Sequence, residues 1–144
     1  MTSIISNLTV AQVQKLSTAT MATLGEEDVA ALKNTHLKVL SSAQLGAIKA
    51  EHMDALTADQ LGNISIKSMS GLKVDQLKAI DESKMTGFSA GQIAALNATQ
   101  MSALTNEQVA ALDVDQIKGL SAAQISAISP EAIAGFSKEE IGAI

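Results

Sequence analysis

The chain repeats every eight residues without a gap, and this repeat limits the possible fold more than any other feature. The 144 residues divide into eighteen octads, and every octad has an apolar residue at its fifth and at its eighth position. The seventh position is mostly Ala or Gly. Such regular internal self-similarity predicts a repeat architecture in which each unit packs on its neighbours.

The spacing of the apolar residues excludes both a strand and one long helix. Apolar positions alternate at distances of three and five residues, which places the two columns on opposite faces of a strand. Ala, Gln and Glu are also poor strand formers. In a continuous helix, eight residues make two turns plus about 80°, so the apolar stripe would wander around the cylinder. The helix therefore has to break once in every octad.

The breaks are specified by capping residues. The first position is Ser, Thr, Asp or Asn in thirteen of the seventeen octads after the first, and these are strong N-caps. Gln or Glu three residues later completes a capping box, as in the pair Thr9 and Gln12. The apolar residues on either side, such as Leu8 and Val13, form a hydrophobic staple. Pro130 falls at the first helical position, where proline is favoured. Each octad is thus predicted to be a helix of about one and a half turns.

Helices this short are unstable alone, so they have to stack. A period of sixteen residues overlies the octad. Five of the six Met occupy the fifth position of alternate octads, and the fourth position is mostly Gln in one set and variable in the other. We therefore predict one all-α solenoid domain over residues 1–144, with eighteen octads paired into nine two-helix units of sixteen residues. The handedness stays open.

Three side-chain series are candidates for chemistry. His36 and His52 are sixteen residues apart and are either a metal or haem ligand pair or variable polar residues at an exposed helical position. The Met column is either a soft-metal ladder or binding groove, or core packing. The Gln series either forms stacked side-chain hydrogen bonds or simply completes the capping boxes. For the histidines no third ligand occurs at matching spacing, unbranched Met suits the uneven gaps between short helices, and the capping role is the simpler account of the Gln series. The structural interpretation is therefore favoured in each case, and we predict no metal and no cofactor.

Composition excludes several functions. The chain has no Cys, hence no disulfide, zinc-thiolate site or cysteine nucleophile. It lacks Arg and has only two aromatic residues, Phe88 and Phe136, which removes the usual means of binding phosphate or stacking bases. A net charge of −5 disfavours nucleic acid and anionic membranes as partners. No nucleophile elbow or phosphate-binding glycine loop is present. We expect a protein that is not an enzyme, binds no nucleic acid and does not insert into a membrane.

One stretch resembles a known class of repeat. Residues 88–112 read FSAGQIAALNATQMSALTNEQVAAL. This run resembles the LTTxQ[VI]xAL-type octapeptide repeats of large bacterial surface and secreted proteins, often labelled as haem-utilisation or adhesion proteins. The resemblance implies a bacterial repeat protein with an extracellular or cell-surface location. No haem site is recognisable, and the N-terminal residues have neither the basic region nor the long apolar region of a cleaved signal peptide.

The terminal octads point to self-assembly. Solenoids normally end in polar capping repeats, whereas here Ile4 occupies a position that is usually polar and the last octad keeps all its apolar residues. We expect two complementary apolar end faces and a head-to-tail homopolymer. The predicted interface consists of Ile4, Ile5 and Leu8 at one end and Phe136, Ile141 and Ile144 at the other.

The function predicted from the sequence is thus that of a structural, self-assembling subunit of a bacterial filament or surface fibre. Two alternatives remain open. The first is a monomeric binding module whose groove would be lined by the variable positions Thr20, His36, His52, Ser68 and Lys84. The second is a spacer segment of an adhesin, cut from a longer repeat protein.

Overall fold

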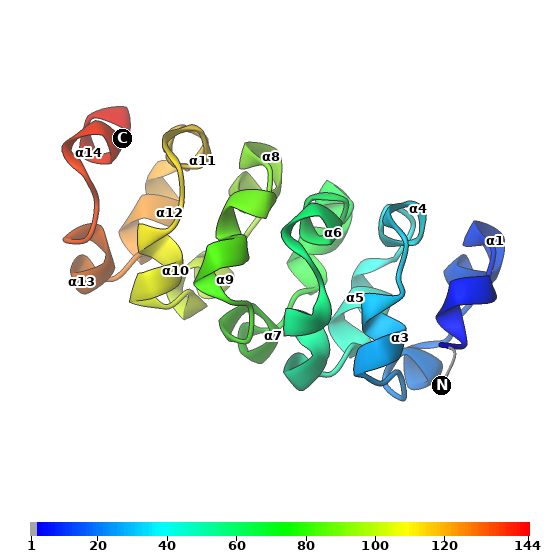
Figure 1. Cartoon of the computed structure of the whole chain (residues 1–144). Coiled ribbons are helices and arrows are strands. Elements are labelled where there is room, and N and C mark those ends of the chain that lie inside the picture. The colour runs from blue at the N-terminus through cyan, green and yellow to red at the C-terminus, as the bar shows by residue number, and fades with distance from the viewer. Residues whose placement is uncertain (1–2) are drawn as a thin grey trace.

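The computed structural model describes residues 3–144 and is helical throughout (Figure 1). Within these residues it contains fourteen α-helices and four 3-10 helices, none longer than six residues, and no strand. Every octad forms one helix, and the chain bends at each octad boundary. The prediction of an all-α repeat solenoid of short capped helices is confirmed.

The helices form three parallel stacks of six. Stack 1 contains α1 (Val10–Gln14), α4 (Asn34–Leu37), α6 (Ala58–Gly62), η4 (Glu82–Gly87), α10 (Asn106–Ala110) and α13 (Pro130–Ile133). Stack 2 contains α2 (Thr18–Met21), α5 (Ser42–Ala47), η3 (Ile66–Gly71), α8 (Ala90–Ala94), α11 (Val114–Lys118) and α14 (Lys138–Ala143). Stack 3 contains η1 (Ile5–Asn7), α3 (Glu26–Ala30), η2 (Ala50–Ala55), α7 (Val74–Lys78), α9 (Ala98–Ala103) and α12 (Ala122–Ala127).

One coil of the solenoid therefore consists of three octads, because all extensively packed helix pairs join elements that lie three octads apart in the chain. The eighteen octads make six such coils. Figure 1 shows the result as an elongated rod with the N- and C-terminal ends at opposite tips. The stacks wind around the rod, since α1, α4 and α6 lie along the upper edge while α10 and α13 of the same stack lie along the lower edge.

The predicted grouping into nine two-helix units is wrong, because each helix packs against the helix three octads away and not two. The sixteen-residue period is visible instead in the type of helix. Octads with Gln, Glu or Asp at the fourth position form α-helices of five or six residues. The other seven form 3-10 helices or four-residue α-helices, and their fourth residues are Ile4, Thr20, His36, His52, Ser68, Lys84 and Ala132. In η2, η3 and η4 the fourth residue's N–H binds the backbone oxygen of the capping residue, which tightens the first turn into 3-10 geometry.

The fifth-position column forms the centre of the core. From Ile5 to Ile117 its residues are 0–1% exposed, and the Met side chains of this column are among them. The eighth-position column lines the same core and is at most 7% exposed from Leu24 to Leu112. The interpretation of the Met column as core packing is confirmed.

Two glycine pairs mark the closest approach between coils. A Cβ on Gly46 would lie 2.6 Å from the carbonyl oxygen of Gly71, and one on Gly62 would lie 2.5 Å from that of Gly87. Both pairs therefore leave no space for a side chain. Close packing thus requires glycine at these four positions, whereas a Cβ on Gly142 would have nothing within 4 Å.

Candidate self-assembly interface

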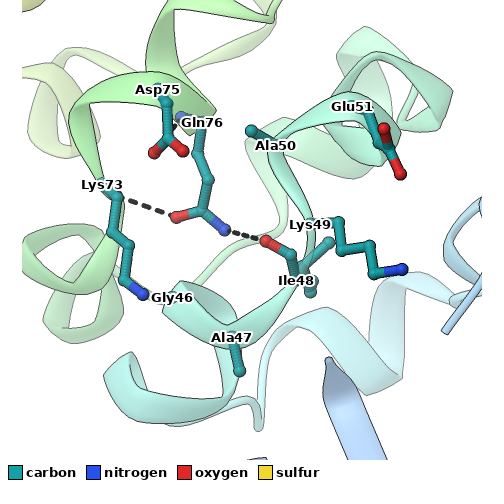
Figure 2. Close-up of a pocket in the computed structure, with 9 residues that line it drawn as sticks. All are labelled: Gly46, Ala47, Ile48, Lys49, Ala50, Glu51, Lys73, Asp75 and Gln76. Atoms are coloured by element: carbon teal, nitrogen blue, oxygen red, sulfur yellow. Dashed lines mark hydrogen bonds between the residues drawn. The ribbon is translucent and has the colours of Figure 1, made fainter. Parts of the chain in front are cut away.

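The interface between successive coils is built by the fourth-position Gln side chains, and each of them has two roles. Figure 2 shows this for Gln76. Its Oε1 accepts the Lys73 N–H at 2.8 Å and completes the helix start, while its Nε2 donates to the carbonyl of Ile48 at 2.6 Å and to that of Leu45 at 2.9 Å. The Gln76 amide thus caps the start of α7 and also binds two carbonyl groups at the end of α5, which lies four octads earlier in the chain.

The same pattern recurs along the rod. Eight Gln amides donate to backbone carbonyls 28 and either 30 or 31 residues earlier. They are Gln44, Gln60, Gln76, Gln92, Gln100, Gln108, Gln116 and Gln124. The capping-box role is confirmed, and the sequence reasoning missed that the other end of the same amide binds the preceding coil.

Three variable fourth-position residues replace Gln in this contact. His36 accepts the Lys33 N–H on Nδ1 at 3.2 Å, and its Nε2 lies 3.0 Å from the Leu8 carbonyl oxygen, so that the neutral ring with a proton on Nε2 donates there. Ser68 donates to the Leu40 carbonyl at 2.6 Å. The expectation that these positions are exposed is wrong for His36 and Ser68, which are 1% and 4% exposed. They hold coils together and do not line an open groove.

Lys84 is the third replacement. Its Nζ binds the carbonyl oxygen and the carboxylate of Asp54, the latter at 2.9 Å. His52 instead lies 3.5 Å from the Glu51 carboxylate. The two histidines therefore have separate partners, and within residues 3–144 no group of three or more His, Cys, Asp and Glu side chains is placed to hold a metal ion.

The two ends of the rod expose different parts of the repeat. On the last coil, the fifth-position column is uncovered, with Ile125 and Ile133 half-buried and Ile141 47% exposed. On the first coil the fifth-position residues Ile5 and Val13 are fully buried, whereas the eighth-position residues Leu8 and Leu16 are half-buried. The fifth-position column is therefore covered by the coil that follows, and the solenoid has a direction.

The predicted interface residues fall into three groups in this structure. Ile4, Ile141 and Ile144 are 62%, 47% and 56% exposed on the end coils. Leu8 and Phe136 are half-buried there. Ile5 is 0% exposed and belongs to the core, because η1 packs against α3. Five of the six side chains are thus at least partly exposed on the first or the last coil.

Several end-face residues were not identified from the sequence. They are Leu16 on the first coil and Ile125 and Ile133 on the last. These residues occupy the same octad positions as buried residues elsewhere. Only the stacking distance of three octads shows that no other coil within residues 3–144 covers them. Gln12 was identified only as a capping residue.

An apolar pocket of about 390 Å³ lies between the last coil and the coil before it. Ile117, Leu120, Ile125 and Ile144 contribute to its lining. A larger hollow on the side of the rod (Figure 2) is shallow and is bordered by Lys49, Glu51, Lys73 and Asp75 around the Gln76 contact. The end pocket is thus the more apolar of the two.

A carboxylate fixes the first coil. Asp28 accepts hydrogen bonds from the Ser3 hydroxyl at 2.7 Å, from the Ile4 N–H at 3.2 Å and from the Gly25 N–H at 3.3 Å. The Ser3 bond, with the two backbone bonds, holds the pKa of Asp28 below its ordinary value against the opposing effect of desolvation. Ionised Asp28 therefore holds the segment that carries Ile4 against α3.

None of the helices in residues 3–144 is both long and apolar enough to span a membrane. Comparison with protein families identifies one similarity: residues 21–58 match the ALTTAQ repeat. This segment runs from the end of α2 to the start of α6, slightly more than one and a half coils. No curated protein matches the chain. By this match, part of the chain is similar to a known repeat family, in agreement with the repeat-type resemblance noted in the sequence.

Proposed function

We propose that this chain is a structural, self-assembling protein whose copies stack head to tail into a filament. The observation that carries the proposal is the difference between the two end faces. The last coil exposes fifth-position residues, which elsewhere in the rod are covered by the following coil. The first coil offers Ile4, Leu8 and Leu16 as the apolar surface that would cover them.

Such a contact leads to an open polymer. The two surfaces differ and lie at opposite tips of the rod, so each bound copy leaves one free face of each kind. A heterologous contact of this sort that does not close into a ring generates a filament. Burial of the Ile4, Ile141 and Ile144 side chains, which are 62%, 47% and 56% exposed, contributes about half of the roughly 1.5–3 kcal/mol that complete burial of such a side chain provides.

We further propose that the filament lies outside a bacterial cell, as a fibre or surface layer. The support is the resemblance of residues 88–112 to repeats of bacterial surface and secreted proteins. The side chains of His36, Ser68 and Lys84 already bind backbone or carboxylate oxygens of other coils, so they do not line a groove for a ligand. The filament is therefore favoured over a monomeric binding module.

The test is negative-stain electron microscopy and sedimentation of the purified 144-residue chain across a dilution series. We expect filaments for the wild type and none for Ile141→Asp/Ile144→Asp, with unchanged helix content. Ile66→Asp/Val74→Asp is the matched control, because these two side chains are 54% and 38% exposed on the middle coils. Monodisperse short rods at all concentrations, or equal filaments from the end-face variant, would contradict the proposal.

A further inference from the structure

We infer the register of the contact between copies, an inference that rests on the proposed head-to-tail assembly. Residue n of one copy takes the place that residue n+144 would have in an uninterrupted solenoid. In this register η1 of one copy packs on α12 of the preceding copy, α1 packs on α13, and α2 packs on α14. Each of these pairs lies within one stack.

The phase of the stacks supports this register. All extensively packed helix pairs within the chain are three octads apart, and the eighteen octads are a whole multiple of three. A second copy that follows residue 144 therefore enters with its first octad on stack 3, its second on stack 1 and its third on stack 2. A displacement by one octad toward the C-terminal end would leave α12 uncovered, and one in the opposite direction would place η1 on α11, which already packs against α14.

Gln12 supplies a polar contact that fits this register. Its Oε1 accepts the Thr9 N–H at 2.8 Å, as in the other capping boxes. Its Nε2 has no acceptor within residues 3–144, while the corresponding amides in later coils reach carbonyls 28 and 31 residues earlier. In the proposed register those carbonyls are Ile128 and Ile125 of the preceding copy. No side chain donates to either within the described residues, and the Ile128 oxygen has no other partner there.

Ile4 supplies the matching apolar contact. It occupies the same octad position as Gln12, so its side chain is directed to the site defined by residues 28 and 31 positions earlier. In the proposed register these are Leu120 and Ile117, which line the apolar end pocket. An exposed Ile at a position that elsewhere is polar thus meets a pocket whose lining also includes Ile125 and Ile144. In this one placement of the second copy, the Gln12 amide meets two carbonyl oxygens to which no side chain of the described residues donates, and the Ile4 side chain meets the apolar end pocket.

Engineered disulfides test this register directly, because the chain has no Cys. In stack 1 a Cβ on Gly135 would lie 3.5 Å from the Cβ of Ala110 in the preceding coil, close to the separation of about 3.8 Å found in disulfides. Lys15 of a second copy and Ala134 have the same relation in the proposed register. We expect Lys15→Cys/Ala134→Cys to form a ladder of covalent multimers on oxidation of the assembled protein. The intramolecular pair Ala110→Cys/Gly135→Cys is the positive control.

A shifted pair is the matched negative control. Lys15→Cys/Gly142→Cys changes the register by one octad, and all three positions are exposed in the single chain. We expect no ladder from it. Gln12→Glu should raise the concentration needed for assembly about tenfold or more, since it loses two hydrogen bonds to carbonyls. Gln14→Glu, an equal charge change at an exposed side chain of the same helix, should assemble as the wild type does.

The outcomes separate the two proposals. If the wild type never polymerises, head-to-tail assembly is wrong and the register falls with it. If it polymerises but the ladder comes from Lys15→Cys/Gly142→Cys, or Gln12→Glu and Gln14→Glu assemble alike, the register is wrong while the proposed function stands.

Discussion

Replacement of Gln92 by Glu tests the central claim that side-chain amides hold the coils together. Gln92 is 1% exposed, accepts the Ser89 N–H at 2.7 Å and donates to the carbonyls of Leu61 at 2.9 Å and Ile64 at 2.7 Å. Glu keeps the shape and the capping acceptor but has no N–H to donate when ionised. The substitution therefore removes the coil contact and preserves the cap.

The expected loss follows from the two hydrogen bonds. Each contributes about 1 kcal/mol net, and the Ile64 carbonyl, which has no other partner in the described chain, adds about 1–2 kcal/mol when left unsatisfied. The sum is a decrease of about 3–4 kcal/mol in the free energy of unfolding. Burial of the new carboxylate against two carbonyl oxygens adds to this loss and raises the pKa of the introduced Glu.

The pH dependence gives a second signature. With its folded-state pKa raised above the unfolded value of about 4.3, the introduced Glu is penalised most at neutral pH. The deficit shrinks as pH falls through the raised pKa, because the protonated carboxyl can donate to one carbonyl again. The wild-type Gln has no such dependence.

The measurement is urea unfolding followed by far-UV circular dichroism, since the chain has neither Trp nor Tyr for fluorescence. Gln12→Glu is the control when both variants are measured on protein diluted below the concentration at which copies assemble, because exposed Gln12 makes the capping contact with Thr9 but no coil contact within residues 3–144. We expect this control to unfold within about 0.5 kcal/mol of the wild type. Equal destabilisation by the two variants would refute the reasoning, since the loss would then come from the cap or the charge alone.

Three further predictions concern other contacts between coils. His36→Gln should retain wild-type stability and His36→Ala should lose about 2 kcal/mol in urea unfolding, because Gln makes the same two contacts at the equivalent position of other octads. Gly71→Ala should destabilise the rod, since its Cβ would overlap a backbone carbonyl, whereas Gly142→Ala should stabilise α14 by about 0.5–1 kcal/mol. The low pKa of Asp28 predicts a stabilising contribution that is present above about pH 4 and is lost as pH falls through that pKa, and Ser3→Ala should weaken this dependence in acid titrations followed by circular dichroism.

The octad was predictable because its signals are local. Capping residues, staples and the position of Pro130 each lie within one octad and act over three or four residues, and the structure has a helix in every octad as they require. The stacking distance is different in kind. It depends on the angle through which the chain bends at each octad boundary. The cap residues at these bends, such as Thr9 and Ser41, have nearly identical extended conformations. The bends of three successive octads together bring a helix back against its neighbour.

The candidate interface was predicted in part for the same reason. Ile4, Ile141 and Ile144 are apolar residues in the terminal octads, which the sequence alone shows, and all three side chains are exposed. Assignment of Ile5 to the core required the contact between η1 and α3, which lie three octads apart. The second role of Gln12 required knowledge that its later equivalents reach back by 28 and 31 residues.

Dilution should separate the copies of a filament before it unfolds the coils of each copy. The reason is a difference between the joint that connects two copies and the boundary between two coils of one chain. In the proposed register the joint between copies presents Ile4, Gln12 and Thr20 at its fourth positions, so it has one Gln amide, as does the boundary closed by Gln124 in the last coil. Similar contacts hold both boundaries, but coils of one chain are tethered and meet at a high effective concentration, whereas a joint bears the full entropic cost of association. Sedimentation should therefore show filaments dissociating to single rods while circular dichroism at the same concentrations retains its helical signal. A helical signal that falls together with the filaments would mean that the single chain does not hold its coils, and that the joint is part of the fold.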